Sequence, residues 1–110
     1  MKYLLSIIIC TMAFAQNINY YDKDGESFAD VSVDELTFTC RVSGMENDGE
    51  AVILLHGFPE TSRMYYDLIP LLVSEGFKVV APDQRGYSPG ARPSKISDYS
   101  IDKLSQDVID

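Results

Sequence analysis

The chain has 110 residues, of which 45% are hydrophobic and 24% charged, and its formal net charge is −8 at pH 7. This composition is typical of a folded globular protein, and the length allows one domain at most. Nine basic against seventeen acidic residues argue against a nucleic-acid partner, and two cysteines with one histidine are too few for a structural zinc site. We therefore expect no nucleic-acid partner, no bound metal and no cofactor.

The N-terminal segment has the pattern of a cleavable export signal. Lys2 supplies a positive start, an apolar run extends over residues 3–13, and an Ala-Phe-Ala cleavage site ends at Ala15. A membrane span needs about 20 apolar residues, so this run is too short to cross a bilayer. We expect a signal peptide at residues 1–15 with cleavage after Ala15, an N-terminal extension at residues 16–27, and an exported (periplasmic or secreted) mature chain without a membrane span. A buried N-terminal strand or helix is the alternative.

Two strands are expected next, joined as an antiparallel hairpin. Residues 28–33 form a β-prone stretch, and residues 36–42 alternate between apolar and polar side chains, which is the period of a half-buried strand. The acidic pair at residues 34–35 lies between them and would form the turn. Cys40 falls on the apolar face, which favours a core residue over a nucleophile.

The rest of the chain alternates strands with helices. Residues 51–55 and 77–81 are continuous apolar runs, as expected of central strands covered on both faces. A helical pattern follows each of them, at residues 61–76 with a kink or restart at Pro70, and from Ser100 onward. This order predicts an α/β fold in which an antiparallel β-hairpin leads into a mostly parallel sheet flanked by helices.

The loop after the first apolar run carries the candidate chemistry. In an open α/β sheet, ligands bind beyond the carboxyl ends of the strands, and residues 56–59 leave the strand at that place. Gly57 and Pro59 favour a tight turn, which can aim the Phe58 backbone N–H at a developing oxyanion. A strand-to-helix turn without chemistry is the alternative.

Two motifs follow in the order VILLHGFPET, at residues 52–61, and GFKVVAPDQRGYS, at residues 76–88. Together they resemble the α/β-hydrolase superfamily, and within it the branch of epoxide hydrolases and haloalkane dehalogenases. The resemblance implies that residues 28–110 are the N-terminal portion of a single α/β-hydrolase domain, which would be incomplete in this chain.

The resemblance also implies roles for the residues of both motifs. The Phe58 N–H would be one donor of an oxyanion hole, within a loop that its neighbours shape and beside a structural turn. His56 is expected to brace this loop, because in such families the nucleophile, the acid and the histidine of the triad come later along the chain. The loop-shaping residues are His56, Gly57 and Pro59, and the turn residues are Asp83, Arg85 and Gly86.

Residues 86–90, GYSPG, fit the G-x-S-x-G pattern of a nucleophile elbow. An elbow takes its second oxyanion donor from the N–H after the serine, and Pro89 has none. Ser88 is therefore expected to be a loop residue. The 110 residues would then lack a nucleophile, an acid and a catalytic histidine, and would be inactive by themselves.

Three functions remain open for the full-length protein. The resemblance favours an enzyme like an epoxide hydrolase, which acts on a small-molecule substrate through a covalent ester on an aspartate. A serine esterase or lipase of the same fold is the first alternative, and a non-catalytic binding protein that kept the fold is the second. The oxyanion loop weighs against the second alternative. No sequence pattern indicates an oligomeric state.

Overall fold

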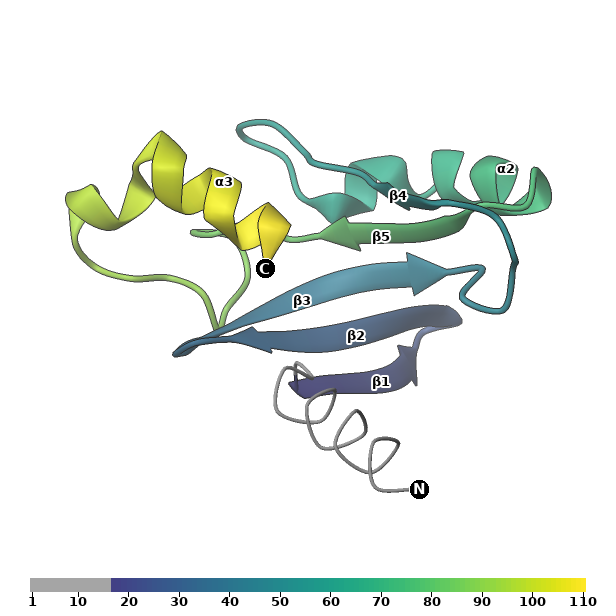
Figure 1. Ribbon diagram of the computed structural model, residues 1–110, viewed down its shortest axis with the longest axis horizontal. Coiled ribbons are helices and arrows are strands. Elements are labelled where there is room, and N and C mark those ends of the chain that lie inside the picture. The colour runs from purple at the N-terminus through teal and green to yellow at the C-terminus, as the bar shows by residue number, and fades with distance from the viewer. Residues whose placement is uncertain (1–16) are drawn as a thin grey trace, which may run out of the picture.

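A five-stranded mixed sheet organises residues 17–110, which are the residues that this computed structural model describes (Figure 1). The strands are β1 (Asn17–Lys23), β2 (Glu26–Val33), β3 (Leu36–Ser43), β4 (Ala51–Ile53) and β5 (Lys78–Pro82). The helical elements are η1 (Ser62–Tyr65), α2 (Leu68–Ser74), η2 (Ile96–Tyr99) and α3 (Ile101–Ile109). The strand order is β1-β2-β3-β5-β4, with β4 and β5 parallel and every other pair antiparallel. The predicted fold class, a hairpin leading into a parallel unit, is confirmed.

The expected hairpin is present as β2 and β3, whose register closes at Val33 opposite Leu36. Asp34 turns the chain with a φ of 53°. The structure adds β1, a strand inside the segment that was expected only as an extension, and pairs it with β2 along its whole length. The turn between them is Asp24-Gly25, with φ values of 52° and 79°. Asp-Gly is a strong hairpin signal, and it could have revealed β1 from the sequence.

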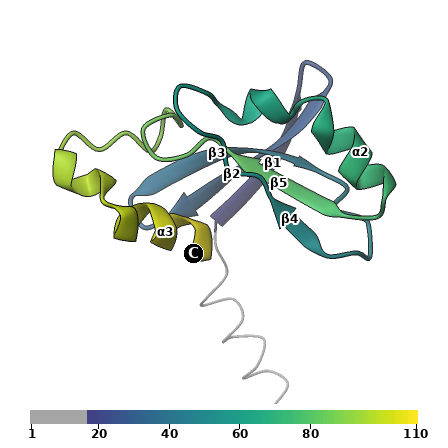
Figure 2. The ribbon, with the colours of Figure 1, turned by 90° about the horizontal axis from the view of Figure 1, so that it is seen from above.

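The two helices lie on opposite faces of the sheet (Figure 2). On one face α2 packs Ile69 against Val79 and Ala81 of β5, both of which are fully buried. On the other face the core consists of side chains from the hairpin with Ala91 from the long loop. Successive residues of β5 alternate between these faces, as a strand requires. Within residues 17–110, no helix is long and apolar enough to span a bilayer.

Within residues 17–110, the apolar run at residues 51–55 lies at an edge of the sheet, whereas a central strand was expected. Only Ala51–Ile53 form β4, and β4 is the last strand of the sheet. Ile53 and Leu55 are 48% and 43% exposed. A continuous apolar run indicates a strand made for burial on both faces, but among the described residues β4 pairs with β5 alone and its side chains are only partly covered.

The helical segment after β4 restarts just before Pro70, in agreement with the prediction, since η1 ends at Tyr65 and α2 begins at Leu68. The Thr61 hydroxyl caps η1 by accepting from the Arg63 N–H at 3.3 Å. Pro70 lies in the first turn of α2, where a missing N–H costs no hydrogen bond. Gly76 ends the helix with a φ of 95°. The predicted apolar side is only partly buried, since Met64, Leu68 and Leu71 are exposed.

Candidate functional site

The candidate site forms where the parallel strands β4 and β5 end. The loop after β4 carries His56 and Phe58, and the loop after β5 carries Gln84. Parallel strands place their carboxyl ends at the same edge, so the two loops meet there although about one helix and one strand separate them in the chain.

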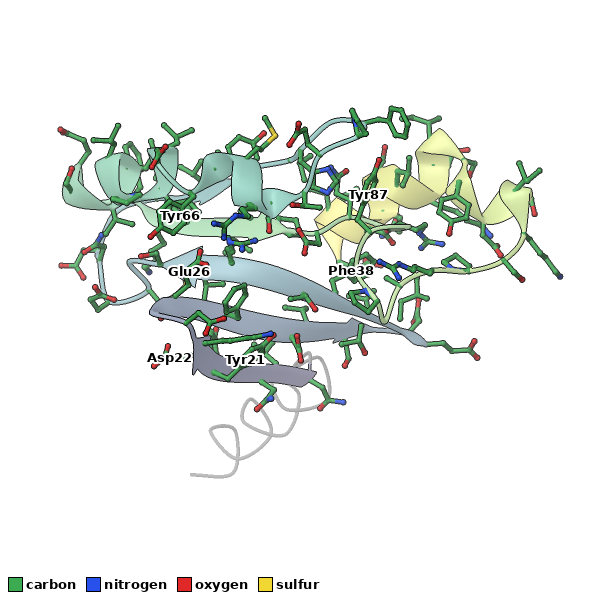
Figure 3. All side chains as sticks on the ribbon, turned by 180° about the vertical axis from the view of Figure 1, so that it is seen from behind. Tyr21, Asp22, Glu26, Phe38, Tyr66 and Tyr87 are labelled. Atoms are coloured by element: carbon green, nitrogen blue, oxygen red, sulfur yellow. The ribbon has the colours of Figure 1, made fainter. Side chains whose placement is uncertain are left out.

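His56 is the residue through which the two loops join. Its side chain is buried, and its Nε2 accepts from the Gln84 backbone N–H at 3.0 Å. Because that bond occupies the Nε2 lone pair, the ring proton lies on Nδ1, which donates to the Gly57 carbonyl oxygen at 3.0 Å. Tyr87, labelled in Figure 3, packs edge-on against the imidazole with a centroid distance of 4.6 Å. Both ring nitrogens are engaged, so His56 has no free lone pair with which to act as a base.

The turn after His56 presents the Phe58 backbone. The Glu60 N–H donates to the Gly57 carbonyl oxygen at 2.9 Å and closes a turn that contains the cis Phe58–Pro59 bond. Within residues 17–110 the Phe58 N–H has no hydrogen-bond partner. The Phe58 side chain is 89% exposed. The loop therefore offers a donor beyond the end of β4.

Gly57 was expected to favour this tight turn as a glycine, but the structure does not require a glycine there. A Cβ added there would meet no atom within 4 Å, and the φ of Gly57 is not in the left-handed region. Within the described residues, the geometry of the turn comes from the hydrogen bonds at His56 and Glu60 and from Pro59.

Asp83 ties the end of β5 to the turns around it. Its carboxylate accepts from the Ser62 N–H at 2.7 Å, and its own N–H donates to the Thr39 carbonyl oxygen at 2.8 Å. Arg41 completes the connection by donating to the Ser62 hydroxyl at 2.6 Å while pairing with Glu26 at 2.9 Å. Glu26 is labelled in Figure 3. These contacts connect the hairpin, η1 and the loop after β5.

The other two predicted turn residues lie against η2 and α3. Gly86 has a φ of 92°, and a Cβ there would lie 3.1 Å from the Tyr99 ring, so this position requires glycine on both counts. Arg85 pairs with Asp107 of α3, Nη2 to Oδ1, at 2.7 Å. Asp83, Arg85 and Gly86 thus flank Gln84, whose backbone N–H donates to His56 of the neighbouring loop.

Ser88 is fully buried and takes part in no reactive arrangement. Its Oγ accepts from the Thr39 N–H at 3.0 Å and donates to the Asp83 carbonyl oxygen. The elbow-like sequence around it is therefore a structural loop, as the sequence predicts.

Three residues of the site were missed by the sequence analysis. Gln84 touches His56 twice, since its side-chain amide also donates to the His56 carbonyl oxygen. Tyr65 donates from its hydroxyl to the Leu55 carbonyl oxygen at 2.6 Å, and Arg41 reaches Ser62. No spacing in the sequence reveals these partners, because each contact joins different elements.

The apolar face beneath α3 is hollowed next to the site. A cavity of about 150 Å³ lies between β3, β4, β5 and α3, and is lined by residues that include Phe38, Cys40, Ile53, Leu55, Val80 and Leu104. Burial raises the pKa of the Cys40 thiol to about 12, with Asp83 and Asp30 adding to the effect. Cys40 is thus a protonated core residue, as expected. In the part of the chain that the structure describes, no three His, Cys, Asp or Glu side chains gather as metal ligands.

The family follows from comparison with known proteins. A family model for the alpha/beta hydrolase fold matches residues 50–108, which include both site loops, α2, β5 and most of α3. The chain belongs to the α/β-hydrolase family. Its similarity to AB hydrolase superfamily protein YfhM of Bacillus subtilis is 41% identity over 86 residues, which is 78% of this chain and 30% of that protein. Epoxide hydrolase A of Mycobacterium tuberculosis is 43% identical over 68 residues, 62% of this chain and 21% of that protein.

Solved α/β-hydrolases share the arrangement of the strands and helices. Epoxide hydrolase A from Mycobacterium thermoresistibile superposes with a TM-score of 0.61 at 28% identity, over 86% of this chain and 26% of that one. Haloalkane dehalogenases are also among the relatives. The predicted resemblance to this branch is confirmed. The 110-residue chain matches less than a third of the length of each of these relatives.

Proposed function

We propose that this chain forms the oxyanion-hole side of the active site of an enzyme that hydrolyses epoxides. The single observation that carries the proposal is the Phe58 N–H, which has no partner within residues 17–110 and lies beyond the carboxyl end of a parallel strand. Several relatives are named epoxide hydrolases, which favours a small-molecule epoxide as substrate. His56 and Pro59 shape the loop, and Asp83, Arg85 and Gly86 support it from the neighbouring turn.

The proposed reaction uses residues of the full-length protein that lie outside these 110. An aspartate attacks an epoxide carbon, one C–O bond of the epoxide breaks, and an alkyl ester with a free alkoxide forms, which takes up a proton. Water, deprotonated by a histidine, then attacks the ester carbonyl, and the histidine returns the proton to the leaving alkoxide, which departs as the diol. In this second step negative charge develops on the aspartate's carbonyl oxygen, and the Phe58 N–H donates to it. One such donor lowers the barrier by about 3–4 kcal/mol.

Single turnover of the full-length protein in water enriched with heavy oxygen tests this reaction. If aspartate is the nucleophile, heavy oxygen enters an enzyme carboxylate, because water attacks the carbonyl carbon of the ester. Stoichiometric inactivation by a phosphonylating reagent, with no label in any carboxylate, would instead identify a serine esterase. Neither label nor inactivation, together with no turnover of epoxides or esters, would leave a binding protein of the α/β-hydrolase fold.

A further inference from the structure

Gln84 holds His56 at two points. Its backbone N–H donates to Nε2 of the ring, and its side-chain amide donates to the carbonyl oxygen of the same residue. The first bond selects the tautomer with the proton on Nδ1. The second bond fixes the direction of the His56 carbonyl, which precedes Gly57. Tyr87 packs against the ring and restricts its rotation.

The two hydrogen bonds from Gln84 to His56 influence the direction of the Phe58 N–H through one peptide unit. The Gly57 carbonyl and the Phe58 N–H belong to the same planar, trans peptide, so they point in opposite directions. The Gly57 oxygen accepts from His56 Nδ1 at 3.0 Å and from the Glu60 N–H at 2.9 Å. Two donors therefore set the direction of this carbonyl, and with it the direction of the Phe58 N–H.

We propose that Gln84 is a positioning residue that aims the Phe58 N–H through His56. The proposal rests on the proposed role of Phe58 as oxyanion donor and extends it to a residue that does not touch the reacting atoms. Without the two hydrogen bonds from Gln84, the ring proton of His56 can move from Nδ1 to Nε2. Nδ1 then no longer donates to the Gly57 carbonyl oxygen. A donor displaced by about 1 Å can cost on the order of 100-fold in rate.

Gln84→Glu in the full-length protein is the informative variant. It keeps the size of the side chain and the backbone N–H, but places a carboxylate oxygen against the His56 carbonyl oxygen that now receives a hydrogen bond. We expect hydrolysis of the enzyme ester to slow by about 10-fold to 100-fold. Formation of the ester should keep its rate, because no negative charge develops on the aspartate's carbonyl oxygen in that step. The ester then accumulates and is detected by intact-protein mass spectrometry.

Ser88→Ala is the matched control. It deletes two hydrogen bonds in the same loop, to Thr39 and Asp83, without touching His56. We expect a lower Tm and an unchanged ratio of ester formation to ester hydrolysis. If Gln84→Glu shows that same unchanged ratio, its role is structural only and the proposal is overturned.

The protonation of the His56 ring provides a test that does not depend on catalysis. In protein labelled with ¹⁵N-histidine and assigned by a His56→Asn spectrum, we expect an Nδ1–H ring in the wild type. In Gln84→Glu we expect a mixed or reversed ring state, because repulsion between the new carboxylate and the His56 carbonyl oxygen moves Nε2 away from the backbone N–H of residue 84. An Nε2–H ring in the wild type, or identical ring signals in the two proteins, would overturn the proposal even in an active enzyme. Absence of label in the enzyme carboxylate, by contrast, counts against the proposed function alone.

Discussion

Arg85 and Asp107 form a two-point ion pair, with Nε 2.8 Å from Oδ2 and Nη2 2.7 Å from Oδ1. A third bond runs from Arg85 Nη1 to the Asp98 carbonyl oxygen at 3.0 Å. Both side chains of the pair are largely buried, and the hydrogen bond with Asp107 raises the pKa of the guanidinium further above its usual value. This pair joins the loop beside the site to α3, which otherwise has few buried side chains.

Asp107→Asn should therefore loosen α3 from the sheet. The variant keeps the shape of the side chain but loses the negative charge and one acceptor, so we expect the free energy of unfolding to fall by about 1–3 kcal/mol. Denaturant titration of the full-length protein measures it. Lys103→Met, which removes the exposed pair with Asp98, is the control and should change the free energy much less, because solvent screens that pair. Equal losses in the two variants would contradict this role for Arg85.

Phe58→Pro should lower kcat of the full-length enzyme by about 100-fold to 1000-fold, because it removes the donor N–H. Phe58→Ala keeps the N–H and, since the side chain is exposed, should retain far more of the rate. Steady-state kinetics on the two purified variants make the comparison. Equal damage from both substitutions would mean that the side chain matters and that the backbone role is wrong.

The 110-residue chain by itself should expose apolar surface that promotes self-association. β4 has a free edge within the described residues, and Ile53 and Leu55 beside it are exposed next to an apolar cavity. An open edge with apolar side chains promotes association with other chains. We expect binding of a hydrophobic dye and self-association in light scattering. A monomer with a cooperative thermal transition and no dye binding would refute this prediction.

Cys40 should make stability fall at alkaline pH. Its pKa is raised from 9.0 to about 12 by burial, so between these values the unfolded state loses the proton and the folded state keeps it. The free energy of unfolding then decreases with rising pH, by up to about 1.4 kcal/mol per pH unit, and is unaffected by Cys40 below about pH 8. Denaturant titrations of the wild type and Cys40→Ala at about pH 8 and pH 10.5 test it. The decrease in the free energy of unfolding between the two pH values should be smaller in Cys40→Ala than in the wild type. Equal decreases in the two proteins would mean that other groups cause the effect, such as Tyr21, whose pKa is also raised by burial.

Export is the prediction that concerns the N-terminus, which lies outside the described residues. We expect mature protein to begin at Gln16 and to be recovered from the periplasm or the medium. Sequencing the N-terminus of secreted protein checks the cleavage site, with Ala15→Arg as a variant that should retain its leader. Intact Met1 on a cytoplasmic product would show that the segment is not a signal peptide.

The sequence by itself determined the elements whose signals are local. Alternation over residues 36–42 predicted β3, and Pro70 and Gly76 predicted the start and the end of α2. The helical pattern from Ser100 onward predicted α3, which the Ser100 hydroxyl caps by accepting from the Lys103 N–H. The motif around Phe58 also located the candidate site. Such signals depend on neighbouring residues only, so they can be interpreted without the fold.

Only the tertiary structure decided which residues meet. Within residues 17–110, β4 lies at the edge because it pairs with β5 alone, at positions 27 residues away, and the apolar run itself does not reveal this. The hydrogen bonds from Gln84 to His56 connect residues 28 positions apart, at the ends of two strands. The buried Ser88 hydroxyl accepts from the backbone N–H of Thr39, which is also distant in the chain. These contacts depend on packing between elements, and hydrogen-bond partners brought together by packing leave no period or spacing in the chain.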